Sequence, residues 1–211
     1  MKFPNYKFIF PPRPKNSVSP TELNYFENQG LLSQPKINGS NTLLFLNKEQ
    51  LIVMNRHGQR LTGFSINTDE ILSLYKGTGG WLVLNAEYLN KSQTDETGRV
   101  FNHKLVIFDI LVYDSNYLVG STFESRVKLL DELYENKECD KEYLYNISEN
   151  VYRVKTYTEN FENLFNNLIK IGMYEGLVFK RMSGKLEMGL RELNTSSSQF
   201  KIRKPTRNYK Y

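Results

Sequence analysis

The sequence QPKINGSN, residues Gln34–Asn41, is the stretch from which the fold and the chemistry of this chain are best interpreted. Its Asn-Gly pair tolerates positive φ angles, so it predicts a tight turn directly after Lys36. Apolar runs at Thr42–Leu46 and Gln50–Met54 follow and predict the two strands of a hairpin. A lysine held beside a turn by a rigid sheet suits a nucleophile. Taken alone, the pattern more often belongs to a hairpin with an exposed lysine beside it.

A nucleophilic lysine needs help from its surroundings. An amine attacks only without its proton, and a free lysine has a pKa of about 10.4. Burial or other nearby cations would favour the neutral form of Lys36. The rest of the chain must therefore supply further cations, a metal ligand and a pocket for a nucleotide.

Composition limits the class of protein. The chain has 211 residues and a net charge of +5, which favours anionic partners such as nucleotides or nucleic acid. The single Cys139 excludes an internal disulfide, and two histidines with one cysteine are too few for a zinc cluster. No apolar run approaches the length of about 20 residues that spans a membrane, and Met1–Pro12 does not resemble a signal peptide. We expect a cytoplasmic protein without a membrane partner.

Helical and strand patterns alternate along one continuous domain, and they predict an α+β fold with mostly antiparallel sheets and flanking helices. Helices are predicted at Thr21–Gln29, with Thr21 as its cap, and at Asn67–Lys76, Thr122–Glu135 and Thr158–Lys170. Further strands are predicted at Trp81–Leu89, Lys104–Tyr113, Glu175–Met182 and Gln199–Arg203.

Three local features refine this prediction. Ser121 and Glu124 form a capping-box pattern before the third helix. Asp109 lies inside the apolar run Lys104–Tyr113 and needs a hydrogen-bond or charge partner if it is buried. Residues 1–20 contain five prolines, so they predict an extended arm packed on a single domain of residues 21–211, or a basic arm that binds nucleic acid.

Short motifs support the interpretation of Lys36. Lys36–Gly39 resembles a Lys-x-Asp-Gly motif, and Asn55–Gly58 resembles a Ser-Arg-x-Gly motif. Leu84–Glu87 resembles a strand that ends in a glutamate, and Phe108–Leu111 resembles a Phe-Asp motif followed by a helix with Glu124–Arg126.

The last two motifs complete the series. Glu175–Lys180 resembles a Glu-Gly-x-Val-x-Lys motif, and Lys201–Arg203 resembles a Lys-x-Lys motif. In this order, over Gln34–Pro205, the chain resembles the nucleotidyltransferase domain shared by ATP-dependent DNA ligases, RNA ligases and mRNA capping enzymes. Each motif alone is weak evidence, whereas the ordered set is strong.

The resemblance implies a lysyl-AMP chemistry. Lys36 would attack the α-phosphorus of ATP, release pyrophosphate and hold AMP as a phosphoramidate. Such a transition state needs cations around the phosphate oxygens. Lys180, Lys201 and Arg203 would bind the phosphate, and Glu175 would bind Mg²⁺ or Mn²⁺.

It also implies the remaining nucleotide contacts. Phe108 would stack on adenine, and Glu87 and Arg56 would contact the ribose or the phosphate end of a nucleic acid. Gln34 would contact the edge of the adenine. Gly39 would let the backbone approach the nucleotide closely.

Three departures from the family pattern matter, and one of them is an arginine, Arg203, in place of the second lysine of the last motif. The usual Asp of the lysine motif is Asn38, which lines the predicted nucleotide site but cannot act as a base or attract a metal by charge. The following Gly39-Ser40-Asn41 resembles RNA-ligase-like members. The sequence also ends at Tyr211, soon after the last motif, so we expect no C-terminal OB-fold domain, as in a compact phage or viral ligase.

The resulting hypothesis is an ATP-dependent polynucleotide ligase that seals a 3′-hydroxyl to a 5′-phosphate. RNA is slightly favoured as substrate, with DNA or a mixed nicked duplex close behind. We expect a monomer in the cytoplasm, which would be the host cytoplasm if the protein is viral. Two alternatives stay open. One is a capping-type guanylyltransferase that uses GTP, and the other is a nucleic-acid-binding remnant of the fold that has lost catalysis.

Overall fold

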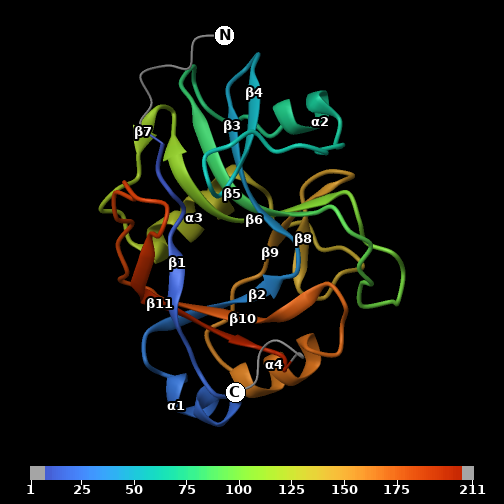
Figure 1. The fold of residues 1–211 in the computed structure, drawn as a ribbon, viewed down its shortest axis with the longest axis vertical. Coiled ribbons are helices and arrows are strands. Elements are labelled where there is room, and N and C mark those ends of the chain that lie inside the picture. The colour runs from blue at the N-terminus through green and yellow to red at the C-terminus, as the bar shows by residue number, and fades with distance from the viewer. Residues whose placement is uncertain (1–7, 206–211) are drawn as a thin grey trace.

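Two β-sheets form the body of the chain, of which the computed structural model describes residues 8–205 (Figure 1). The smaller sheet has the order β1-β11-β10-β2, and the larger has the order β4-β3-β5-β6-β9-β8 with β7 paired to β6. The strands of the smaller sheet are β1 (Arg13–Ser17), β2 (Leu31–Ile37), β10 (Tyr174–Arg181) and β11 (Thr195–Arg203). Those of the larger sheet are β3 (Ser40–Leu46), β4 (Leu51–Asn55), β5 (Leu82–Leu89), β6 (Lys104–Tyr113), β7 (Asn116–Tyr117), β8 (Leu144–Asn146) and β9 (Val151–Val154).

The predicted α+β class is confirmed. Within residues 8–205, the strand pairs β1–β11 and β6–β9 are parallel, and the other paired strands are antiparallel. Helices α1 and α4 lie against the smaller sheet at the bottom of the view, while α2 and α3 lie beside the larger sheet (Figure 1). No helix in the described part of the chain is both long and apolar enough to cross a membrane.

The helices are shorter than the sequence pattern predicts. They are η1 (Pro20–Glu22), α1 (Leu23–Phe26), α2 (Thr68–Leu72), α3 (Phe123–Leu133) and α4 (Phe161–Leu168). The last of these begins late because Asn160 has the left-handed φ of 58°. The predicted apolar face of α4 is confirmed, since Phe161, Leu164, Phe165 and Leu168 are buried.

Two predicted helix caps are wrong. Ser19, not Thr21, caps the first helical turn, where it forms a reciprocal capping box with Glu22. Thr122, not Ser121, caps α3, while the Ser121 hydroxyl donates to the Leu118 carbonyl. In each case the observed cap lies within two residues of the predicted one. The presence of Ser and Thr predicts that a cap exists, but the backbone conformation before the helix decides which residue forms it.

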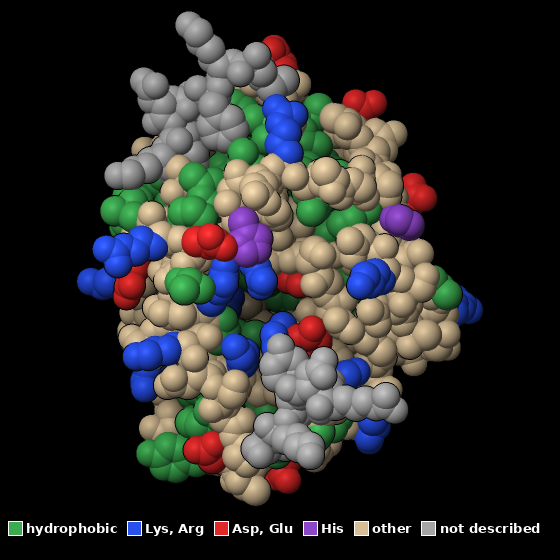
Figure 2. Space-filling model, in the orientation of Figure 1, with side chains coloured by type: hydrophobic (Ala, Val, Ile, Leu, Met, Phe, Trp, Pro, Cys, Tyr) green, Lys and Arg blue, Asp and Glu red, His purple; other side chains and the backbone are tan. Residues whose placement is uncertain are grey.

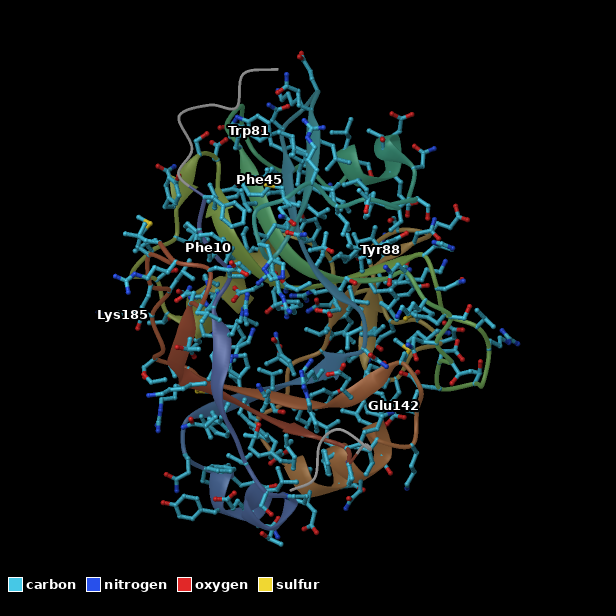
Figure 3. All side chains as sticks on the ribbon, in the orientation of Figure 1. Phe10, Phe45, Trp81, Tyr88, Glu142 and Lys185 are labelled. Carbon is cyan, nitrogen blue, oxygen red and sulfur yellow. The ribbon has the colours of Figure 1, made fainter. Side chains whose placement is uncertain are left out.

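The strand predictions fare better. Strand β6 has the predicted bounds, and the hairpin of β3 and β4 is confirmed by pairing of Leu46 with Leu51. Phe45 and Tyr88 both extend from the larger sheet and are buried (Figure 3). Strand β11 begins four residues earlier than predicted, at Thr195. The sequence pattern missed β1, β2, β7, β8 and β9.

The N-terminal arm contains a strand. Its described part, residues 8–20, includes β1, which pairs in parallel with β11 at the edge of the smaller sheet. Residues 1–7 of the predicted arm and residues 206–211 of the predicted domain lie outside the described residues.

The predicted left-handed turn at Asn38 and Gly39 is wrong. Neither residue has a positive φ, and the segment instead carries the chain from β2 in the smaller sheet to β3 in the larger one. The glycine is required for a different reason. A Cβ atom at Gly39 would lie 2.6 Å from the carbonyl oxygen of Tyr88, on the neighbouring strand β5. Lys36 is therefore the last part of one sheet before the chain crosses to the other.

Candidate active site

A cavity of about 580 Å³ opens between the two sheets, and charged side chains surround the corresponding hollow on the surface (Figure 2). Both sheets and the arm before β1 contribute to its lining. All the predicted site residues line it except Asn38, whose backbone N–H donates to the Met173 carbonyl instead. Those that line it are Gln34, Lys36, Gly39, Arg56, Glu87, Phe108, Glu175, Lys180, Lys201 and Arg203.

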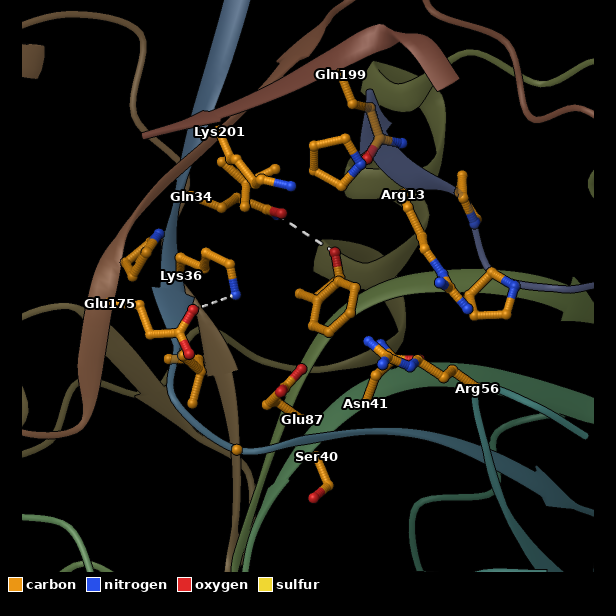
Figure 4. A pocket seen from close by; sticks show the side chains of 18 of the residues that line it. Arg13, Gln34, Lys36, Ser40, Asn41, Arg56, Glu87, Glu175, Gln199 and Lys201 are labelled. Atoms are coloured by element: carbon orange, nitrogen blue, oxygen red, sulfur yellow. Dashed lines mark hydrogen bonds and ion pairs between the residues drawn. The ribbon is translucent and has the colours of Figure 1, made fainter. Parts of the chain in front are cut away.

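Strand register brings Lys36 to Glu175. Gly176 on β10 pairs with Lys36 on one side and with Arg203 on the other. The adjacent Glu175 carboxylate then lies between both cations, with its Oε2 2.6 Å from Lys36 Nζ and 3.2 Å from Arg203 Nε (Figure 4). Gly176 permits this arrangement, because its φ is +146° and a Cβ atom there would lie 2.1 Å from the Ile202 carbonyl oxygen. The predicted nucleophile and the predicted metal ligand thus form an ion pair.

Lys180 is a buried residue of the cavity lining. The residue is 4% exposed, and its Nζ lies 4.2 Å from the centre of the Phe123 ring and 3.8 Å from Asp109 Oδ2. Burial, together with repulsion from Arg126, lowers the pKa of Lys180 to about 8, although Asp109 opposes the change. A lysine with this pKa exchanges its proton close to neutral pH.

Asp109 is buried and forms an ion pair with Arg126, as its place in an apolar strand requires. Arg126 donates to it from Nε at 2.8 Å and from Nη2 at 3.1 Å, and the backbone N–H of Ile110 donates at 2.9 Å. Burial alone would raise the pKa of Asp109, but Arg126 and Lys180 outweigh it and hold that pKa below the ordinary value. Arg126 already donates two hydrogen bonds to the Asp109 carboxylate. The negative charge of Asp109 therefore compensates only part of the positive charge of Lys180.

Glu87 and Lys201 complete the charged lining. Burial, with repulsion from Glu175, raises the pKa of Glu87 to about 7, while Lys36 acts in the opposite direction. Near neutral pH its carboxyl group can therefore donate as well as accept a hydrogen bond. Burial, followed by the charges of Arg203 and Lys36, lowers the pKa of Lys201.

Gln34 contacts the backbone of Phe108. Its Nε2 donates to the Phe108 carbonyl oxygen at 3.4 Å and to Thr156 Oγ1 at 3.4 Å (Figure 4). A carbonyl oxygen only accepts, so the amide nitrogen must point to Phe108. The Gln34 oxygen, a hydrogen-bond acceptor, remains for a ligand in the cavity.

Several lining residues were not predicted as site residues. Arg13 comes from the proline-rich arm, His57 from the turn after β4, and Asn41 from the start of β3. Asn41 donates to Asn85 Oδ1 at 3.0 Å, while its own Oδ1 is buried without a partner among residues 8–205. Asn41 and His57 lie within or beside predicted motifs, which could have identified them, but nothing in the arm distinguishes Arg13 from its other basic residues.

The residues present fit a single magnesium ion that would be held mainly by the phosphates of a bound nucleotide. Among residues 8–205, no three His, Cys, Asp or Glu side chains gather to hold a metal. Mg²⁺ is often bound by one or two carboxylates together with substrate phosphates and water. Glu175 offers such a carboxylate beside Lys36 and Arg203. The ion would neutralise charge on the phosphates, and its site at Glu175 stays a prediction.

Comparison with known proteins identifies the family. The family profile of the ATP-dependent DNA ligase domain matches residues 85–196, just over half of the chain. No curated protein matches the sequence.

Solved structures agree on the fold. The ligase domain of M. tuberculosis LigD has 15% identity and a TM-score of 0.63, with 96% of this chain and 61% of that chain covered. Mycobacterial DNA ligase D complexed with ATP and MES has 15% identity and a TM-score of 0.64, with 96% and 62% covered. A Lig E DNA ligase has 14% identity and a TM-score of 0.54, with 93% and 70% covered. This chain thus spans about three fifths of the two mycobacterial structures. It belongs to the ATP-dependent DNA ligase domain family.

Proposed function

We propose that this domain is the nucleotidyltransferase of an ATP-dependent polynucleotide ligase, which joins a 3′-hydroxyl to a 5′-phosphate through AMP bound to Lys36. The observation that carries the proposal is one cavity in which Lys36 and Glu175 form an ion pair beside Lys201 and Arg203. Scattered basic residues would suffice for a domain that only binds nucleic acid. A half-buried carboxylate shared by two cations in one cavity is more than binding requires.

The first step would attach AMP to the protein. Lys36 must first lose a proton, and the Glu175 carboxylate, 2.6 Å away, can accept it. Lys36 Nζ then forms a bond to the α-phosphorus of ATP, and the bond between that phosphorus and the oxygen of the β-phosphate breaks, releasing pyrophosphate. Lys201 and Arg203 would stabilise the negative charge on the phosphate oxygens.

The second and third steps would use the nucleic acid. An oxygen of a 5′-phosphate bonds to the phosphorus of AMP, the P–N bond to Lys36 breaks, and the amine takes up a proton. The 3′-hydroxyl then attacks the 5′-phosphate, and AMP leaves. Each displacement occurs in the same cavity, so each can use the same cations.

The orientation of Gln34 supports ATP over GTP. At position 6 of the purine ring, adenine has an amino group that donates a hydrogen bond, whereas guanine has an oxygen that accepts one. Since the Gln34 nitrogen points to Phe108, the amide presents an oxygen that can accept from the 6-amino group of adenine but would repel the 6-oxygen of guanine at the same place. This contact argues against the capping-type guanylyltransferase.

RNA is the slightly favoured strand. The support is the sequence Gly39-Ser40-Asn41 and the side chain of Asn41, which lines the cavity with a buried, unpartnered Oδ1 among the described residues. That oxygen could accept a hydrogen bond from a ribose 2′-hydroxyl, which DNA lacks. Ligation of nicked RNA, DNA and mixed duplexes under identical conditions tests this preference, and faster joining of all-DNA nicks would contradict it.

The test of the proposed function is covalent labelling. The protein is incubated with Mg²⁺ and either α-labelled ATP or α-labelled GTP, and then separated under denaturing conditions. We expect labelling by ATP but not by GTP, none in Lys36→Ala, and normal labelling in Lys128→Ala, an exposed lysine on α3. Labelling of Lys36→Ala, or labelling by GTP alone, would refute the proposal.

A further inference from the structure

The arm before β1 brings an arginine into the cavity. Pro12 and Pro14 fix the backbone on either side of Arg13, whose N–H donates to the Asn194 carbonyl at 2.8 Å. Arg13 pairs with Thr195 in the parallel ladder of β1 and β11. Its side chain lines the cavity and points into it (Figure 4). The backbone therefore holds this arginine in place before any ligand binds.

The guanidinium group of Arg13 has two unused hydrogen-bond donors. Its Nε and Nη2 atoms are buried, and neither has a hydrogen-bond partner among residues 8–205. Burial, and then the charge of Arg56, lowers the pKa of Arg13, and Glu192 compensates only in part. A buried cation with unused donors is costly. A phosphate ligand would remove that cost, because a guanidinium group binds phosphate oxygens in pairs.

Lys36 and Arg13 lie at opposite edges of the smaller sheet. Lys36 is on β2 and Arg13 begins β1, with β10 and β11 between these strands. Figure 4 shows the two side chains on opposite sides of the cavity. Lys201 and Arg203, which would bind the α-phosphate, come from β11 between the two edges. A triphosphate with its α-phosphate at these residues can therefore extend from Lys36 toward Arg13.

The chemistry of the first step requires that direction. In phosphoryl transfer the attacking and leaving atoms lie roughly in line through the phosphorus. Lys36 Nζ would attack from one side of the α-phosphorus, so the β- and γ-phosphates must leave toward the opposite side. On that side Arg13 offers two donors that no residue within 8–205 uses.

We propose that Arg13 binds the β- and γ-phosphates of ATP and stabilises the diphosphate that leaves when AMP is attached to Lys36. This inference rests on the proposed function and adds a catalytic residue to its first step. When the bond between the α-phosphorus and the bridging oxygen breaks, the electron pair stays on that oxygen, and the diphosphate gains negative charge. Arg13 keeps its proton and donates its two unused N–H groups to the oxygens of the leaving group.

The experiment measures the first step in both directions. Protein loaded with labelled AMP is freed of ATP and incubated with Mg²⁺ and inorganic diphosphate. An oxygen of the diphosphate then bonds to the phosphorus, the P–N bond to Lys36 breaks, the amine takes up a proton, and labelled ATP is released. Arg13→Ala should raise the KM for diphosphate about tenfold, the value of one charged hydrogen bond. It should also slow labelling by ATP about 10²-fold, with an intermediate rate for Arg13→Lys, which keeps the charge but not the paired donors.

Joining of a strand that already carries a 5′-adenylate is the control reaction. It uses the same fold and the same nucleic acid, but it releases AMP and no diphosphate. Arg13→Ala should perform it within about twofold of the wild-type rate, which shows that the variant is folded and binds nucleic acid.

Lys15 provides the matched control variant. It lies on the same strand and carries the same charge, but it is exposed and does not line the cavity. Lys15→Ala should keep both the wild-type KM for diphosphate and the wild-type rate of labelling.

The outcomes separate two failures. If wild type is labelled by ATP and Arg13→Ala keeps the wild-type KM for diphosphate, the inference is wrong while the proposed function stands. If joining of the 5′-adenylated strand by Arg13→Ala falls as far as labelling does, Arg13 acts on the nucleic acid or on the fold, and the inference is overturned. If wild type is not labelled by ATP, the proposed function itself fails.

Discussion

Replacing Lys180 with methionine should stabilise the fold and slow the transfer of AMP. Lys180 is 4% exposed, and its pKa of about 8 compares with an ordinary value of 10.5. At about 1.36 kcal/mol per pKa unit, the charged lysine costs the folded state about 3 kcal/mol at pH 6. Methionine fills a similar volume without a charge. Asp109 keeps both bonds from Arg126, so the change leaves no unpaired carboxylate.

The pH dependence of that gain is the sharper test. The folded-state pKa of Lys180 lies below the unfolded value, so its cost is full below pH 8 and disappears as the pH rises above 10.5. Urea unfolding of wild type and Lys180→Met at pH 6 and pH 9 measures the difference. We expect Lys180→Met to be more stable by about 2–3 kcal/mol at pH 6, and the difference to shrink by about 1.4 kcal/mol at pH 9.

Lys141 provides a control of equal burial and opposite electrostatics. It is also 4% exposed, but its Nζ contacts Asp95 at 2.9 Å and Asp140 at 2.6 Å. These two acids outweigh burial and raise the pKa of Lys141, so its ion pairs contribute stability at both pH values. Lys141→Met should destabilise the protein by about 3 kcal/mol or more, because it leaves Asp95 buried and unpaired. A stability difference between wild type and Lys180→Met that does not change with pH would refute the reasoning.

The same variant tests function. A lysine kept in the protein at a cost in stability is expected to act on a ligand. Lys180→Met should slow the transfer of AMP to Lys36 by about 10² to 10³, the value of one preorganised contact to developing charge. Unchanged labelling of Lys180→Met would mean that this lysine does not act on the phosphate.

Two further substitutions test the site. Glu175→Gln keeps the shape of the side chain but removes the charge that holds Lys36 and Arg203, so labelling by ATP should fall about 10²-fold and respond only weakly to added Mg²⁺. Titration of labelling against Mg²⁺ measures this response, and a response equal to that of wild type would exclude Glu175 as the metal ligand. Gly39→Ala should destabilise the protein by about 1–3 kcal/mol in urea unfolding, because its Cβ would lie 2.6 Å from the Tyr88 carbonyl oxygen; a stability equal to wild type would show that β5 moves away without cost.

The sequence predicted those helices and strands whose formation depends on a local pattern of residues. The ten-residue run Lys104–Tyr113 became β6 with the predicted bounds, because a long apolar run bounded by polar residues has few alternatives. The helices became shorter than predicted because apolar spacing continues past the residue at which the backbone stops being helical. Asn160 illustrates this, since its left-handed φ of 58° excludes the preceding residues from α4. Every residue that the motifs predicted for the site lines the cavity except Asn38, although the cavity has further lining residues.

What the sequence could not predict is which strands pair. The smaller sheet joins β1, β2, β10 and β11, so residues 13 and 203 belong to one sheet. Pairing of β1 with β11 brings Arg13 into the cavity, and no periodicity within residues 1–20 indicates that partner. The short strand β9 was missed for a related reason. Four residues, Val151–Val154, become a buried strand only because β6 and β8 lie on either side.

The cavity itself follows from the crossing at Asn38 and Gly39. Had these residues formed a hairpin turn, β2 and β3 would be neighbours in one sheet, and Lys36 would lie within its surface. Because the chain instead passes from the smaller sheet to the larger one, Lys36 and Asn41 lie on opposite sheets only five residues apart, and both line the cavity between them. Gly39 lies against the Tyr88 carbonyl on β5, the strand that also carries Glu87. The glycine of the lysine motif thus lets the chain enter β3 in close contact with β5, the neighbouring strand of the larger sheet.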